Sequence, residues 1–158
     1  MKRGTLVFII GLILGVLITA VAGTAFLTKK MFVVHESRYG FNETVYQLEK
    51  SAKENEWGIP HSYNLQKTLK EKGGYDVAPV NVLSLCKPEH AYKILSKDEQ
   101  RLVSALMPCR VAVFEKEGKT YISMLNSGLF SRFLGDEAKN VMGTASAENL
   151  QILQTIIK

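Results

Sequence analysis

At 158 residues the chain has room for one domain, and its formal net charge of +5 would suit an acidic or polyanionic partner. Nearly all of that excess charge lies in the basic residues flanking one apolar segment, Lys2, Arg3, Lys29 and Lys30. The rest of the chain is close to neutral and has no basic stripe interleaved with aromatic residues, so nucleic-acid binding is excluded as a function class.

The apolar segment predicts a membrane anchor. Thr5 to Leu27 contains no charged residue, and as a helix it would span roughly 34 Å at about 1.5 Å per residue, enough for a hydrocarbon core of about 30 Å. A cleaved signal peptide is the competing interpretation, because Ala20-Val21-Ala22 fits the small-x-small rule. The length favours a retained anchor. We therefore expect residues 1–30 to cross the cell membrane once and residues 31–158 to form one extracytoplasmic domain.

Small residues recur on one face of this segment, at Gly11, Gly15, Thr19 and Gly23. That spacing lets two membrane helices approach closely, although glycine is also common in membrane helices for other reasons. Both explanations stay open.

The first half of the domain predicts two strands, each followed by a helix. A strand over residues 32–39 precedes a helix that Asn42 caps, with apolar positions at helical spacing. A second strand over residues 57–63 precedes a short helix that Asn64 caps and Gly73-Gly74 ends.

The second half predicts a buried strand, Val80 to Cys86, and a helix that Pro88 starts. After a charged break at residues 96–100, alternating residues predict a β-hairpin from residue 109 to residue 126 with its turn at Gly118. Ser127 begins a helical turn that includes Phe133, and a last helix runs over residues 148–158. This order predicts an α+β fold: one largely antiparallel sheet, helices on one face, a β-hairpin and a C-terminal helix near the end.

Several landmarks together resemble the bacterial and archaeal family of domain of unknown function 302. The resemblance covers roughly residues 34–133 and rests on four groups of residues: Glu43-Thr44 with Leu48; Gly58 with Asn64-Leu65-Gln66-Lys67-Thr68-Leu69-Lys70; Leu85-Cys86-Lys87-Pro88 with Ala91; and Leu106-Met107-Pro108-Cys109-Arg110-Val111 before Gly118. It implies a compact α+β domain that pairs as a homodimer and carries no firmly assigned activity. Two positions depart from the family pattern, since Lys87 stands where asparagine is frequent and Asn64 where aspartate is frequent.

Cys86 and Cys109 are the first candidates for chemistry. Cys86 ends a strand directly before a helix N-terminus, whose partial positive charge can stabilise a thiolate. Arg110 adjoins Cys109, although strand alternation places its side chain on the other face. Three interpretations compete: two buried structural thiols, a disulfide, or a reactive or metal-binding pair. No Cys-x-x-Cys motif supports a zinc site.

The remaining candidates are His61, which we expect beside the cysteine strand, and Asn126, at the end of the hairpin. No metalloprotease helix motif, nucleophile elbow or phosphate-binding glycine loop occurs. We therefore expect a binding or protein-interaction domain without catalysis of its own, with its ligand and cofactor unidentified. The candidate ligand-binding residues are Cys86, Cys109, His61, Arg110 and Asn126. The alternative is a thiol-redox or soft-metal protein that binds copper, zinc or haem through Cys86, Cys109 and His61.

Overall fold

The computed structural model describes residues 3–131 and 134–158, and the chain divides into two units, Met1–Phe32 and Val33–Lys158. The first unit is one continuous helix, α1 (Arg3–Lys30). Its stretch Val7–Phe26 is long and apolar enough to cross a membrane, as the sequence predicts. A retained anchor and a signal sequence share this length and composition, so the choice between them remains a prediction.

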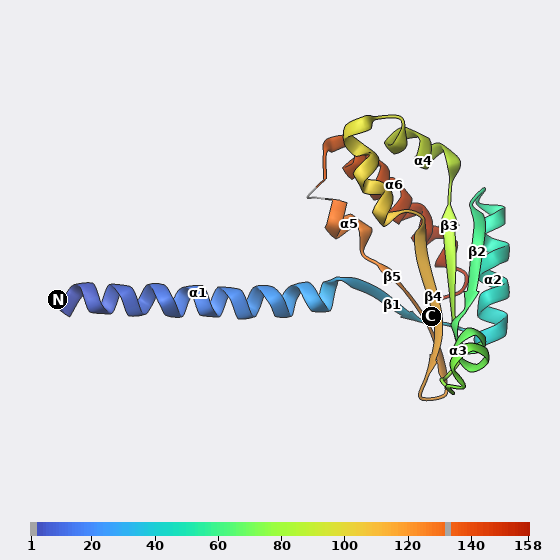
Figure 1. The fold of residues 1–158 in the computed structure, drawn as a ribbon, viewed down its shortest axis with the longest axis horizontal. Coiled ribbons are helices and arrows are strands. Elements are labelled where there is room, and N and C mark those ends of the chain that lie inside the picture. The colour runs from blue at the N-terminus through green and yellow to red at the C-terminus, as the bar shows by residue number, and fades with distance from the viewer. Residues whose placement is uncertain (1–2, 132–133) are drawn as a thin grey trace. The chain divides into compact units, whose positions relative to one another are not determined.

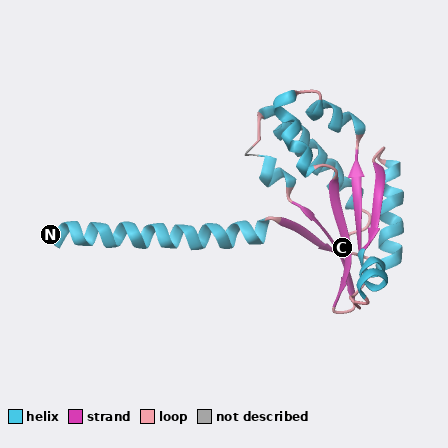
Figure 2. Ribbon diagram, viewed as in Figure 1, coloured by secondary structure: helices cyan, strands magenta, loops and turns pink. Residues whose placement is uncertain are grey.

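The second unit is built on a five-stranded open sheet in the order β1-β5-β4-β3-β2 (Figure 2). Each of the neighbouring pairs among the strands β2 to β5 is antiparallel. The strands are β1 (Phe32–Glu36), β2 (Gly58–Asn64), β3 (Val80–Cys86), β4 (Cys109–Lys116) and β5 (Lys119–Leu125). Together with the helices, this sheet confirms the predicted α+β class.

The helices connect and cover these strands: α2 (Phe41–Glu54), α3 (Leu65–Gly73), α4 (Pro88–Leu95), the 3₁₀ helix η1 (Asp98–Leu106), α5 (Ser127–Phe130) and α6 (Asp136–Leu153). One of them, α3, starts and stops as the sequence predicts. Asn64 caps α3, since its side chain accepts a hydrogen bond from the backbone N–H of Lys67 at 2.8 Å, and Gly74 ends the helix in the left-handed conformation with φ 70°.

The predicted hairpin is also confirmed, and its two-residue turn explains its geometry. Glu117 and Gly118 have positive φ angles of 54° and 73°, the pattern of a type I′ turn, whose twist matches that of the flanking strands. The resulting register places Val111 opposite Met124 and Val113 opposite Ile122. These four buried side chains share one face of the sheet.

The main core forms where α2 and α6 cover that face. Leu48 and Ala52 from α2, and Ala145, Ile152 and Leu153 from α6, pack against the inward residues of β3, β4 and β5. A smaller cluster joins α4, η1 and α6 through Ile94, Val103 and Ala138. Figure 1 shows α4 and α6 gathered at the end of the sheet where β3 stops, while the β4–β5 turn lies at the opposite end. The chain between β3 and β4 therefore forms a helical cover over one end of the sheet.

Three local predictions are wrong in detail. The N-cap of α2 is Gly40, not Asn42; the helix already begins at Phe41, and the Thr44 hydroxyl donates to the Gly40 carbonyl at 2.9 Å. The last helix begins at Asp136 and ends at Leu153 instead of running over residues 148–158. Residues 98–100, predicted as part of a charged break, are the first residues of η1. Phe133 lies outside the described residues.

Candidate functional site

A small recess lies at the helical end of the sheet. Its volume is about 40 Å³, enough for an ion or a water, because a water needs roughly 10–15 Å³. Strands β3 and β4 reach it where Leu85 pairs with Cys109. Helices α4 and α6 close it from the other side with Ile94, Val141 and Ala145. The wall is therefore mostly apolar and comes from elements far apart in the sequence.

Sulfur is unusually frequent in this wall. Cys86, Met107, Cys109 and Met142 all line the recess. The chain has two cysteines and five methionines, so both cysteines and two of the methionines gather here. Both cysteines are free thiols. The structure thus brings together the cysteine pair that the sequence singles out.

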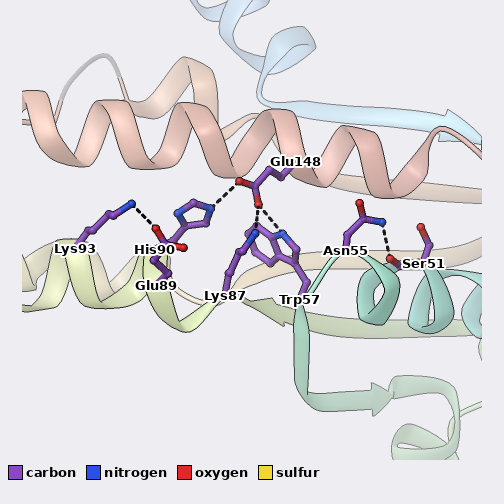
Figure 3. A network of polar contacts seen from close by, with 8 residues as sticks. All are labelled: Ser51, Asn55, Trp57, Lys87, Glu89, His90, Lys93 and Glu148. Carbon is purple, nitrogen blue, oxygen red and sulfur yellow. Dashed lines mark hydrogen bonds and ion pairs between the residues drawn. The ribbon is translucent and has the colours of Figure 1, made fainter.

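A carboxylate network borders the recess (Figure 3). Glu148 on α6 accepts one hydrogen bond from the indole N–H of Trp57 at 2.9 Å and another from the Lys87 ammonium at 3.1 Å. The same carboxylate lies 3.1 Å from Nε2 of His90. Trp57, Lys87 and His90 each also line the recess. One glutamate on α6 thereby fixes three side chains of the wall, which come from the α2–β2 connection and from the start of α4.

The charge state of Glu148 determines which His90 nitrogen carries the proton. Burial by itself would raise the pKa of Glu148, but the hydrogen bonds from Lys87, Trp57 and His90 outweigh it, so this pKa lies below its usual range. An ionised carboxylate can only accept hydrogen bonds, so Nε2 of His90 must be the donor. In neutral histidine the other nitrogen, Nδ1, then keeps a free lone pair.

That nitrogen has no hydrogen-bond partner. Within the part of the chain that the structure describes, Nδ1 of His90 is a buried polar atom without one, and the His90 side chain is only 11% exposed. The ring packs against Trp57 with 5.7 Å between the ring centroids. Unsatisfied buried polar atoms are uncommon in native proteins, and Nδ1 is one of four such side-chain atoms among the described residues.

Cys109 lies in a less polar environment than Glu148. Burial raises the pKa of its thiol, and the nearby thiol of Cys86 raises this pKa further. A hydrogen bond from the Asn149 side chain lowers the pKa and partly offsets the rise. Cys109 is therefore a protonated, poorly nucleophilic thiol at neutral pH in the ligand-free protein. Asn149 is almost fully buried on α6 directly after Glu148, so adjacent residues of this helix serve the carboxylate network and the thiol.

His61 and Arg110 lie elsewhere on the sheet. The register pairs His61 with Ser84 and Ser84 with Arg110, so these residues form one row across β2, β3 and β4. That row is next to the Leu85–Cys109 row, and alternation directs the two rows to opposite faces. Both His61 and Arg110 are exposed, and the His61 ring lies 5.8 Å from that of Tyr63. His61 is not among the residues that line the recess.

Asn126 has a structural role at the start of α5. Its side-chain oxygen accepts a hydrogen bond from the Leu129 backbone N–H at 3.2 Å, which is an N-cap. Of the five residues that the sequence selects, the structure therefore brings Cys86 and Cys109 into one recess, and it places His61, Arg110 and Asn126 outside it.

The residues that border the cysteines were not predicted as site residues from the sequence: Trp57, Lys87, His90, Met142, Glu148 and Asn149. A weak signal for two of them exists. The buried positions of α6 include Val141, Ala145, Asn149 and Ile152 at helical spacing, so a polar residue interrupts an apolar stripe next to Glu148. Within the described ranges, no group of three or more His, Cys, Asp or Glu side chains is placed to hold a metal ion.

Comparison with known proteins adds two findings. The sequence pattern of a family described as "Domain of unknown function DUF302" matches residues 33–157. The fold resembles the crystal structure of an uncharacterized conserved DUF302 protein from Bacillus stearothermophilus, with a TM-score of 0.70 and 26% sequence identity over 78% of this chain and 95% of that chain. No curated protein matches.

Proposed function

The chain belongs to the family of domain of unknown function DUF302, and from this premise we propose that residues 33–158 form a ligand-binding domain that α1 holds at the outer side of the cell membrane. The observation that carries the proposal is the recess itself. It is lined by the two cysteines and by His90, whose Nδ1 is buried without a hydrogen-bond partner, and the Glu148 network holds His90, Trp57 and Lys87 in its wall. An apolar hollow with a few polar side chains in its wall is typical of small-ligand sites.

Entry of small molecules tests this proposal without knowledge of the ligand. Full-length protein in detergent is treated with methyl methanethiosulfonate, a small neutral thiol reagent, and the labelled cysteines are identified by mass spectrometry. We expect labelling of Cys86 or Cys109 in the folded protein, and slower labelling in Ala145→Phe, which fills the recess from α6. Labelling only after unfolding, also at alkaline pH where exposed thiols ionise, would show that the recess is closed packing and not a binding site.

A thiol-redox role is the second candidate, because both thiols are free and line the same recess. The raised pKa of Cys109 argues against it, since exchange needs a thiolate. A reversible Cys86–Cys109 disulfide formed in a glutathione redox buffer would support this role. Protein that stays fully reduced across that buffer range would remove it.

The family resemblance also leads us to propose a homodimer. The outer face of the sheet carries Val82, Ala112 and Phe114, which are only partly buried, and it gives a second copy an apolar surface to cover. Sedimentation of the full chain in detergent should show a dimer. A monomer at every protein concentration would contradict this proposal.

The anchor has its own test. A retained α1 should keep the full-length protein in the membrane fraction after carbonate extraction, and an added protease should cleave the domain only from the outer side. Recovery of a soluble form that begins near Gly23 would instead indicate signal cleavage. Cleavage of the domain only from the cytoplasmic side would contradict the proposed orientation.

A further inference from the structure

We propose that the recess binds one monovalent soft metal ion of the Cu(I) class, held by the thiolates of Cys86 and Cys109 with a thioether from Met107 or Met142. This inference rests on the proposed binding function and names the ligand class of the same recess. It uses neither His61 nor any residue outside the recess. The observation that carries it is that both cysteines and two of the five methionines line one hollow of about 40 Å³.

The donor set selects the metal. Thiolate and thioether sulfur are soft ligands and favour Cu(I), whereas Zn²⁺ in structural sites takes four ligands from cysteine, histidine and carboxylate groups. In the described parts of the chain no three such residues converge, so the recess lacks the ligands that zinc requires. A monovalent soft ion accepts fewer ligands and, unlike zinc, binds thioethers readily. The two methionines therefore distinguish the two metals.

The size of the recess agrees with an ion and not with a larger group. Its 40 Å³ exceeds the space of roughly 10–15 Å³ that a water needs. It is far below the volume of about 300–1,000 Å³ that pockets for organic ligands have. A haem therefore has no room in the recess.

Binding is a simple exchange of protons for the ion. The two S–H bonds break, two protons leave to solvent, two metal–sulfur bonds form, and no electron is transferred. One positive ion on two thiolates leaves one negative charge in the recess. The Lys87 ammonium lines the same recess and is tied to Glu148 at 3.1 Å, so a positive group already lies beside the site.

The binding test uses the full-length, reduced protein in detergent under anaerobic conditions. Cu(I) is offered as its coloured bicinchoninate complex, and Ag(I) serves as a redox-inert substitute. We expect one ion to bind per chain and to remove Cu(I) from the chelator. Zn²⁺ should not compete with it. Equal affinity for Zn²⁺ and Cu(I), or no transfer of Cu(I) from the chelator, would overturn the inference.

Variants locate the ion. The double variant Cys86→Ser, Cys109→Ser should lose at least about 100-fold in affinity for the ion. Residues that only hydrogen-bond to metal ligands already contribute about 10–100-fold, and the ligands themselves should contribute more. Met142→Leu and Met107→Leu together should lose at least about tenfold in affinity. Met124→Leu is the matched control, because Met124 has the same 8% exposure as Met142 but lies outside the recess. An equal loss in Met124→Leu would overturn the assignment of the thioethers.

A measurement on the unaltered protein keeps the inference testable if the cysteine variant does not fold. Ag(I) should protect Cys86 and Cys109 from methyl methanethiosulfonate, and Zn²⁺ should not. Labelling without protection by Ag(I) would refute the metal site and leave the proposed binding function standing. No labelling of the folded protein at all, with or without Ag(I) and also at alkaline pH, would refute both.

Discussion

Two glutamates of similar exposure have different roles in this domain. The side chains of Glu148 and Glu36 are 28% and 24% exposed, and the pKa of each carboxyl lies below its usual range. Glu36, on β1, pairs with Lys119 and Lys158, which are both 58% exposed. Glu148 is held by Trp57, Lys87 and His90, which are 4%, 20% and 11% exposed. The two sites therefore differ in the burial of the partners and not in that of the carboxylate.

This difference indicates what each site does. The backbone N–H of Lys158 also donates to the Glu36 carbonyl at 3.0 Å, so the Glu36 pairs hold the segment that follows α6 against β1. Exposed ion pairs of this kind contribute little to stability. The donors of the Glu148 network are largely buried beside the recess. Removal of one partner therefore destabilises the folded protein, because the other partners stay buried without a hydrogen bond. Glu148 therefore holds together the wall of a recess, whereas Glu36 joins β1 to β5 and to the segment that follows α6.

The largest expected effect comes from removal of the carboxylates. Glu148→Ala leaves the Trp57 indole N–H and the Lys87 ammonium without their acceptor and should lower the free energy of unfolding by about 1–3 kcal/mol. Glu36→Ala is the matched control and should have a clearly smaller effect. Urea unfolding of both full-length variants in the same detergent measures the difference. Equal losses would contradict the distinction between the two glutamates.

The dependence of stability on pH should show a smaller effect with a defined sign. Both carboxyls have folded pKa values below the ordinary value of 4.5, so the unfolded chain binds more protons in acid. The stability that they contribute is complete above about pH 4.5 and is lost as the pH falls through the folded pKa values. These carboxyls take up protons between roughly pH 5 and pH 3. In that range Glu148→Gln should lose stability less steeply than the unaltered protein as the pH falls. Identical slopes would show that Glu148 is not held ionised by its partners.

Removal of one donor should have the smallest effect. Trp57→Phe keeps an aromatic ring but deletes the indole N–H that Glu148 accepts at 2.9 Å, and it should cost about 0.5–1.5 kcal/mol beyond the packing loss. A double-mutant cycle with Glu148→Ala isolates this hydrogen bond. If the effects of the two substitutions are strictly additive, the indole contributes nothing to the network.

Local signals in the sequence predicted much of the fold. The Gly118 turn, the alternation in Cys109 to Phe114 and the proline at the start of α4 each specify their element within a few residues, and the structure agrees. The start of α6 was missed because its first buried positions include the small residue Ala138, and Gly143 lies in its middle, so its apolar face is indistinct. Asn42 failed as a cap because it lies inside the first turn of a helix that begins at Phe41.

The candidate site was only half predictable for a different reason. Cys86 and Cys109 stand out as the only cysteines, and strand pairing brings them to one end of the sheet. The contacts of Glu148 with Trp57, Lys87 and His90 join residues 91, 61 and 58 positions apart. No short spacing encodes such contacts. The packing of α6 on α4 and on the α2–β2 connection creates them, and this packing appears only once the tertiary structure is known.

Trp57 offers the most direct test of the central claim that the recess beside Glu148 is a ligand site. It is the only tryptophan, and it lines the recess, so its fluorescence reports on that place alone. Titration of the reduced full-length protein with Ag(I) should change the Trp57 emission and saturate at one ion per chain. The same titration of the Cys86→Ser, Cys109→Ser variant should give no saturable change. An unchanged emission in the unaltered protein, or the same curve in both proteins, would contradict the account.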